Sequence, residues 1–106
     1  MTVSEWSIME EKVAQEAFKI AYEREIEALT KEVRDKASSI AEINDLWNLH
    51  DFLSARRHDI DGKYDYQESA LIFVFARLLK EGWLKIGELE GLSAEKRSKI
   101  SVLSRM

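Results

Sequence analysis

The sequence predicts an all-α protein, and three observations support this fold class. The 106 residues contain no proline and only four glycines, the two residue types that disfavour helix most strongly. Apolar residues recur at steps of three and four along much of the chain, which is the spacing of one helical face. Helix-start signals, in which an N-cap residue precedes a carboxylate by a few positions, occur at four points. The length is typical of one domain.

The first helix is expected to begin at a capping box formed by Ser7 and Glu10. A stripe of helical spacing follows, interrupted by one lysine. Its members are Ile26, Leu29, Val33, Lys36, Ile40, Ile43 and Trp47. The stripe runs through a second capping signal, Ser39-Ile-Ala-Glu42. Two helices that meet near Ser38 would fit this pattern, but the continuation of the stripe through the capping signal favours one nearly continuous helix over roughly 8 to 60.

The length of such a helix predicts a homodimer. About 50 helical residues would span roughly 75 Å, whereas a compact domain of this size has a radius of gyration near 13 Å. The rest of the chain could not cover the apolar stripe, so a second copy is expected to pack on it. This inference depends on the chain not folding back near Ser38.

The second half of the chain is expected to form shorter helices. Gly62 is a helix-stop signal, and Asp65 with Glu68 forms a capping box for a helix over 66 to 81. Glycines at 82, 87 and 91 interrupt the next segment, which is expected to form only a short turn-like helix around Leu84 to Leu89. Ser93 then begins a last helix over about 94 to 105. We therefore predict a single all-helical domain over 1–106, with a stalk over about 7–61 and a head over about 65–106.

Phe73 and Phe75 lie in a run that is apolar on every side of its helix. Such a run is either buried on most faces or covered by a partner, and its spacing favours the core for both phenylalanines. The last helix is basic, because it carries Lys96, Arg97, Lys99 and Arg105. This group is either a solvated face or a contact for an acidic protein.

The segment LWNLHDFLSARRHDIDGKYD, residues 46 to 65, contains both histidines of the chain. On a helical wheel Ile43, Leu46, Leu49 and Leu53 form an apolar arc. His50 and Arg57 fall within this arc, and Trp47 and Asp51 lie beside it. An aromatic, an arginine and a carboxylate set into an apolar stripe are typical of an interface hot spot. Arg57 would then pair with Asp51 of a second copy. Ordinary packing with solvated surface charge remains the alternative.

The composition and the motifs disfavour several other functions. The net charge of −4 disfavours nucleic-acid binding, and the absence of cysteine excludes a thiol nucleophile. The two His-Asp pairs lie about 80° and about 12 Å apart on a helix, so they cannot share one metal ion. No complete calcium loop, nucleophile elbow or phosphate-binding loop occurs. We expect no catalytic residue, no metal and no cofactor.

No targeting or membrane segment is evident in the sequence. The first residues lack a basic region followed by an apolar run. The most apolar stretch, residues 70 to 79, is about half of the ~20 residues that a membrane-spanning helix needs. We therefore expect a soluble, intracellular protein.

Three segments, WNLHDFLSARRHDIDGKYD, SALIFVFARLLKEG and KRSKI, resemble the cyanobacterial fluorescence recovery protein family. The resemblance is close over roughly residues 40 to 106. It implies a non-enzymatic regulator that binds the photoactivated orange carotenoid protein through that protein's C-terminal domain. Such a regulator accelerates the red-to-orange back-conversion and helps detach its partner from the phycobilisome, which restores antenna fluorescence.

The resemblance also implies a fold, a location and site residues. It implies a cytoplasmic all-α homodimer, next to thylakoid-attached phycobilisomes, with no cofactor because the carotenoid belongs to the partner. By position, the family's key patch falls on Trp47, His50, Asp51 and Arg57, with Leu46 at the dimer contact. The head-domain partner contact falls on Phe73 and Lys99. Whether the first patch serves dimerisation, partner binding or both stays open, and a structural coiled-coil-like dimer or adaptor is the alternative function.

Overall fold

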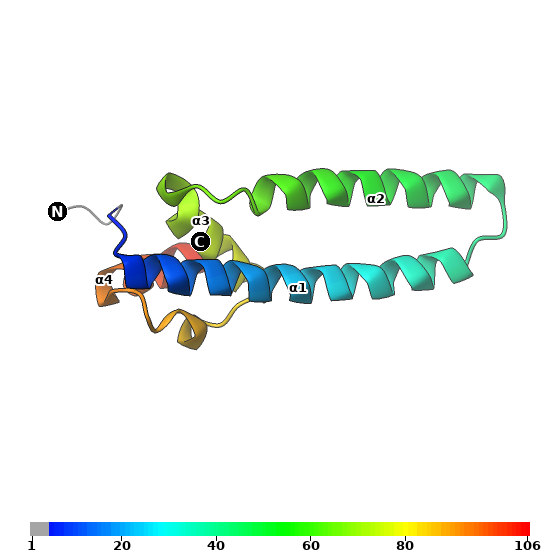
Figure 1. The fold of residues 1–106 in the computed structure, drawn as a ribbon. Helices are drawn as coiled ribbons and strands as arrows, with labels where there is room; N and C mark the ends of the chain where they lie inside the picture. The colour runs from blue at the N-terminus through cyan, green and yellow to red at the C-terminus, as the bar shows by residue number, and fades with distance from the viewer. Residues whose placement is uncertain (1–4) are drawn as a thin grey trace. The chain divides into compact units, whose positions relative to one another are not determined.

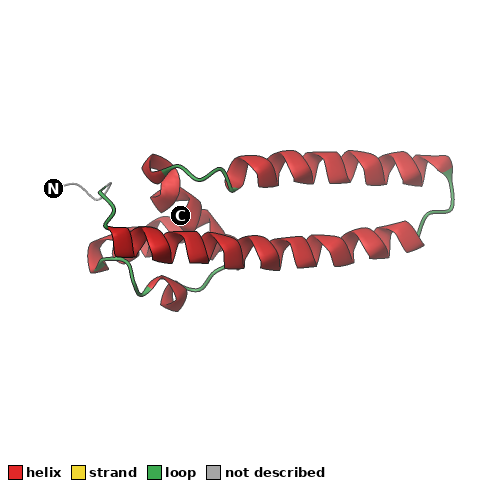
Figure 2. Ribbon diagram, viewed as in Figure 1, coloured by secondary structure: helices red, strands yellow, loops and turns green. Residues whose placement is uncertain are grey.

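A computed structural model describes residues 5–106, which fold into helices joined by short loops (Figures 1 and 2). The described elements, in order, are α1 (Ile8–Ser38), α2 (Ile43–Lys63), η1 (Glu68–Ala70), α3 (Leu71–Glu81), η2 (Ile86–Leu89) and α4 (Ala94–Ser104), where η denotes a 3₁₀ helix. No strand occurs within residues 5–106. The predicted all-α class is confirmed.

Two of the predicted helix starts are confirmed. At α1 the N–H of Ser7 donates to Oε1 of Glu10 at 3.1 Å, and the N–H of Glu10 donates to Oγ of Ser7 at 3.1 Å. This reciprocal pair is a capping box. At α4 the N–H of Lys96 donates to Oγ of Ser93 at 3.2 Å.

The other two predicted starts are wrong. The carboxylate of Asp45 accepts the N–H groups of Ala41 at 3.0 Å and Glu42 at 3.1 Å, so α2 begins at Ile43 rather than at Ser39. At the other site Gln67, not Asp65, is the N-cap residue, and it opens the short helix η1 instead of α3. At α2 the side chain of Asp45 supplies the cap, whereas Gln67 makes no side-chain cap hydrogen bond at η1.

The expected continuous helix over roughly 8 to 60 is also wrong, because α1 ends at Ser38 and α2 begins at Ile43. The hydroxyls of Ser38 and Ser39 both donate to the carbonyl of Asp35, at 2.8 and 3.2 Å. Such side-chain bonds compete with the helical ladder and favour its end. The loop of residues 39–42 contains four residues, which is close to the number in one helical turn. The spacing of three and four along the sequence therefore continues across the loop, although the loop is not helical. The length argument for a second copy therefore fails.

Gly62 does not end α2, which continues through Lys63. Among the described glycines only Gly82 has a positive φ, at 86°, and it caps the C-terminus of α3. A left-handed residue at this position is the usual helix terminator, and glycine adopts it without strain.

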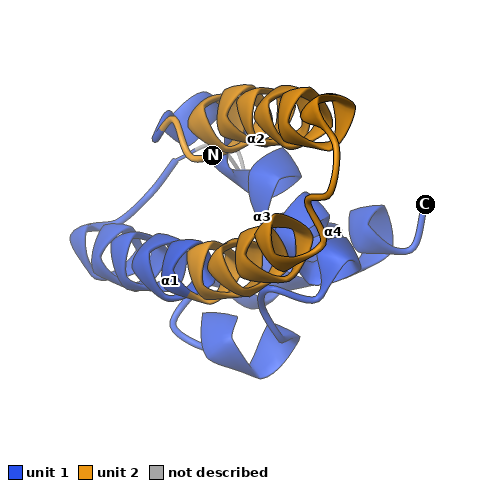
Figure 3. Ribbon diagram, turned by 90° about the vertical axis from the view of Figure 1, so that its right-hand side faces the viewer, with its two compact units in different colours: residues 1–23, 66–106 blue, residues 24–65 orange. Residues whose placement is uncertain are grey.

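The chain packs into two units, which Figure 3 colours separately. The hairpin unit comprises residues 24–65, namely the end of α1, the loop and α2. The core unit comprises the described residues before Arg24 and all residues from Tyr66 onward. Among residues 5–106 we find no helix with the length and apolar character that a bilayer crossing requires.

The core unit is built around aromatic and aliphatic side chains. Phe18 of α1 meets Phe75 of α3 and Tyr66 edge to face, each with ring centroids 5.4 Å apart. Small residues on the same side of α1, Ala14 and Ala17, are buried, which allows close approach of the neighbouring segments. The other buried apolar residues include Leu71, Leu78, Leu84, Leu89, Leu92 and Ile100.

In the hairpin unit the end of α1 and α2 run antiparallel (Figure 1). The side of α2 that faces α1 carries half-buried or buried residues at steps of three and four, namely Asp45, Leu49, Phe52, Arg56, Ile60 and Lys63. The ammonium of Lys36 on α1 lies 4.6 Å from the centroid of the Phe52 ring. Long polar side chains therefore contribute to the contact between the two helices.

Candidate functional site

Another side of α2, exposed to solvent, carries most of the residues that the sequence singled out. Leu46, His50, Leu53 and Arg57 follow one another at steps of four and three, so they lie on one face of the helix. We call this face, with Ile43 and Trp47 beside it, the outer face of α2. All six residues are exposed, and Trp47 is 56% exposed. Exposed apolar side chains grouped in this way mark a contact surface.

The polar residues of the outer face form only weak pairs within one chain. Nδ1 of His50 lies 3.3 Å from Oδ1 of Asp51, and Nε of Arg57 lies 3.7 Å from Oδ2 of Asp61. All four side chains are at least 70% exposed, so solvent screens these pairs strongly. Arg57 and Asp51 are thus accessible for contact with a second molecule. The described residues contain no cluster of His, Asp and Glu that could hold a metal ion.

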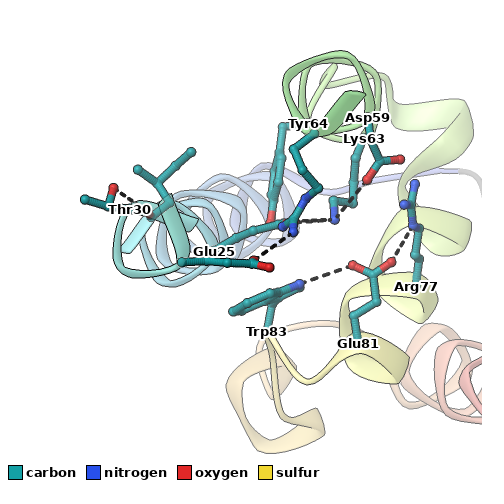
Figure 4. A network of polar contacts seen from close by, with 11 residues as sticks. Glu25, Thr30, Asp59, Lys63, Tyr64, Arg77, Glu81 and Trp83 are labelled. Carbon is teal, nitrogen blue, oxygen red and sulfur yellow. Dashed lines mark hydrogen bonds and ion pairs between the residues drawn. The ribbon is translucent and has the colours of Figure 1, made fainter. Parts of the chain in front are cut away.

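A buried polar network in the hairpin unit holds the end of α2 against α1 (Figure 4). The carboxylate of Glu25 is 2% exposed and accepts hydrogen bonds from Lys63 Nζ at 2.9 Å and the Tyr64 hydroxyl at 2.8 Å. Arg56 adds a longer contact at 3.4 Å. Each partner here is needed, because a buried carboxylate without donors is strongly unfavourable. Nothing in the sequence indicated this network, since Glu25 and Lys63 are 38 residues apart.

The two phenylalanines of α3 have different environments. Phe75 is fully buried in the core unit, whereas Phe73 is 63% exposed. The core interpretation is therefore right for Phe75 and wrong for Phe73. An exposed phenylalanine at the centre of a helix is available for contact with another protein.

The basic residues of α4 also divide into two groups. Lys99 and Arg105 are exposed. Lys96 is 5% exposed, and Nε of Arg97 donates to the carbonyl of Leu92 at 3.2 Å. The expectation of one basic face over all four residues is wrong, because two of them stabilise the fold.

Lys96 and Glu10 form an ion pair in the core unit. Nζ of Lys96 lies 3.0 Å from Oε1 of Glu10, contacts the carbonyl of Glu5 and sits 4.9 Å from the Trp6 ring centroid. Oε2 of Glu10 also accepts the N–H of Ser93 at 2.9 Å. Burial alone would raise the pKa of Glu10, but these donors outweigh it and lower the pKa from 4.5 to about 2.

The structure thus gathers Leu46, Trp47, His50 and Arg57 on one side of α2, with Asp51 at its margin. Phe73 and Lys99 are exposed on α3 and α4 in the core unit. Val102 is also exposed on α4, and a single valine in a basic helix gives no sequence signal that would indicate this.

Comparison with known proteins identifies the family. The family model described as photoprotection regulator fluorescence recovery protein matches residues 6–104. The fluorescence recovery protein of Synechocystis sp. strain PCC 6803 is 54% identical over 101 residues, covering 95% of this chain and 93% of that protein.

Solved structures agree in fold. The structure of the Fremyella diplosiphon fluorescence recovery protein superposes with a TM-score of 0.92 at 60% identity, covering 96% of this chain and all of that one. The structure of the protein from Synechocystis sp. PCC 6803 gives a TM-score of 0.91 at 53% identity, with the same coverage. The chain therefore belongs to the fluorescence recovery protein family of photoprotection regulators.

Proposed function

We propose that this chain is a non-enzymatic regulator that binds the photoactivated orange carotenoid protein through that protein's C-terminal domain. It accelerates the red-to-orange back-conversion and helps detach its partner from the phycobilisome, so that antenna fluorescence recovers. The observation that carries this proposal is the exposed outer face of α2 in a member of a family of photoprotection regulators. The protein acts in the cytoplasm, next to thylakoid-attached phycobilisomes.

The site residues have two roles in this proposal. The outer face of α2, with Leu46, Trp47, His50 and Arg57 and with Asp51 beside it, forms the homodimer contact and contributes to partner binding. Phe73 and Lys99 contact the carotenoid protein. In this proposal the segment of about 7–61 serves as a stalk, and the segment of about 65–106 serves as a head.

Acceleration requires no chemistry from this chain. A protein that speeds the back-conversion of its partner must bind the transition state of that change more tightly than it binds the red form. Holding the separated parts of the partner close together achieves this, because the entropy of bringing them together is supplied by binding. The carotenoid remains in the partner, so no cofactor site is needed here.

The test follows the orange absorption of the full-length carotenoid protein in the dark after illumination, with and without this chain. We expect faster recovery with the chain, and recovery unchanged by the chain would refute the proposal. Phe73→Ala and Lys99→Glu should each reduce the acceleration, whereas Ile86→Ala, at another exposed apolar residue of the core unit, should not. If both site variants accelerated recovery as well as the unmodified chain, a purely structural dimer or adaptor would be the better description.

A further inference from the structure

A second exposed surface lies on α3 and α4 and combines apolar with cationic side chains. Phe73, Arg77 and Lys80 follow at steps of four and three, so they share one face of α3. Lys99 and Val102 of α4 and Arg105, the C-cap residue of α4, follow at steps of three. All six are exposed. We call these six residues the α3–α4 surface.

One contact shows that the two stripes meet. The ammonium of Lys80 donates to the main-chain oxygen of Met106 at 3.0 Å. This places the end of the α3 stripe beside Arg105, at the end of the α4 stripe. Because α3 and α4 also pack against each other, the stripes are neighbouring faces of one helix pair.

The surface combines two exposed apolar side chains with an excess of positive charge. Phe73 is 63% exposed and Val102 is 49% exposed. Arg77 pairs with Glu81 at 2.7 Å, so the excess charge comes from Lys80, Lys99 and Arg105. The chain as a whole carries a net charge of −4, so the sign of the charge is reversed locally. Such a surface complements an acidic protein surface that has an apolar recess.

We propose that Val102, Lys80 and Arg105 extend the contact of Phe73 and Lys99 into one continuous docking surface for an acidic protein partner. The inference rests on the proposed function, which supplies the partner. In this surface Phe73 and Val102 supply the apolar contacts, and Lys80 and Arg105 pair with carboxylates of the partner.

The apolar part is tested with Val102→Asp, and Ile86→Asp is the matched control. Ile86 has a similar exposure, 42%, and lies in the same unit outside the surface. The measured quantities are the dissociation constant for the full-length illuminated carotenoid protein and the recovery rate. We expect Val102→Asp to weaken binding about tenfold, because the new carboxylate would be buried in an apolar contact and would face an acidic partner. Ile86→Asp should leave both quantities unchanged.

The charged part is tested with the double variant Lys80→Glu/Arg105→Glu. Its control is Lys12→Glu/Lys19→Glu, which reverses two exposed lysines of α1 in the same unit. The first pair should weaken binding and flatten its dependence on salt concentration, because charge pairs at an interface rim are screened by salt. The control pair should keep most of the affinity and the salt dependence. Unfolding midpoints of all variants show whether each one is folded.

The outcomes separate this inference from the proposed function. If the unmodified chain does not accelerate recovery, both fail. If it does, and folded Val102→Asp and Lys80→Glu/Arg105→Glu bind like the unmodified chain, only the larger surface is refuted. If light scattering shows that these variants instead change self-association, the surface contacts a second copy and the proposed occupant is wrong.

Discussion

Single side chains in the core unit carry several stabilising roles. Glu10 caps α1 through Ser7, caps the loop before α4 through the N–H of Ser93, and pairs with Lys96. One carboxylate thus joins the start of α1 to the start of α4. The charge of this carboxylate should accordingly contribute to stability.

Replacing Glu10 by Gln should make the stability depend less on pH. The folded-state pKa is about 2 and the ordinary value is 4.5, so the carboxylate stabilises the fold fully above pH 4.5. That contribution is lost as the pH falls from 4.5 towards 2. We expect Glu10→Gln to cost about 1–2 kcal/mol at pH 7 and almost nothing near pH 2. Urea unfolding at both pH values measures this, and an equal loss at both would contradict it.

Gly91 occupies a position that has no room for a side chain. A Cβ atom at this position would collide with Cγ2 of Val13 on α1, whereas one at Gly87 would meet nothing within 4 Å. Gly91→Ala should therefore destabilise the core unit by about 1–3 kcal/mol, the usual cost of overpacking. Gly87→Ala should be close to neutral. Urea unfolding of both variants provides the comparison.

A double variant tests the cause of that loss. Adding Val13→Ala to Gly91→Ala removes the colliding methyl groups, so the pair should be less destabilised than the sum of the single changes. Strict additivity would show that the space beside Val13 is not the reason for glycine at position 91.

At the scale of elements, the loop between α1 and α2 is decided by polar side chains rather than by apolar spacing. Ser38 and Ser39 bond back to Asp35, and Asp45 caps α2 from inside its first turn. These residues are visible in the sequence, but the apolar stripe remains in phase through the loop and suggested one helix. Local hydrogen bonding therefore outweighed periodicity in fixing where the chain turns.

Glu25 should be more important for the hairpin unit than any exposed charge. Glu25→Leu leaves the ammonium of Lys63, with a side chain only 1% exposed, without its main partner. We expect a loss of about 3 kcal/mol in the free energy of unfolding, as is typical of a broken buried pair. Glu27→Leu, at an exposed position of the same helix, should cost far less. Chemical denaturation monitored by circular dichroism measures both.

The compensating variant separates an unpaired charge from lost packing. Glu25→Leu/Lys63→Met removes both charges, so it should recover much of the stability that Glu25→Leu loses. If the double variant were as unstable as Glu25→Leu, the hydrogen bond from Tyr64 would be the more important contact of Glu25.

At the scale of the whole molecule, the sequence was sufficient for the fold class and for most of the helices. It also placed His50, Arg57 and Leu46 on one face of a helix, because that result depends only on spacing. The sequence did not predict the contacts between residues far apart in the chain. The pairing of Lys96 with Glu10 spans 86 residues, and it removes one lysine from a face that looked uniformly basic.

The oligomeric state is the property of the whole molecule that decides how the outer face of α2 is used. The length argument for a dimer fails with the turn after Ser38, but the apolar side chains of the outer face remain exposed. Leu46→Glu places a charge in their centre, and we expect it to convert a dimer into a monomer, because an unpaired carboxylate is costly to bury. Light scattering over a range of concentrations measures the mass.

Ala55→Glu is the matched control for Leu46→Glu. Ala55 is exposed on α2, about 180° around the helix from Leu46, so the same charge added there should leave the mass unchanged. A dimer that persists in Leu46→Glu would place the interface elsewhere. If Leu46→Glu is a monomer and still accelerates recovery of the carotenoid protein, the outer face serves self-association, and partner binding resides on α3 and α4. If acceleration is lost with the dimer, while Ala55→Glu retains both, the two roles share one face of α2.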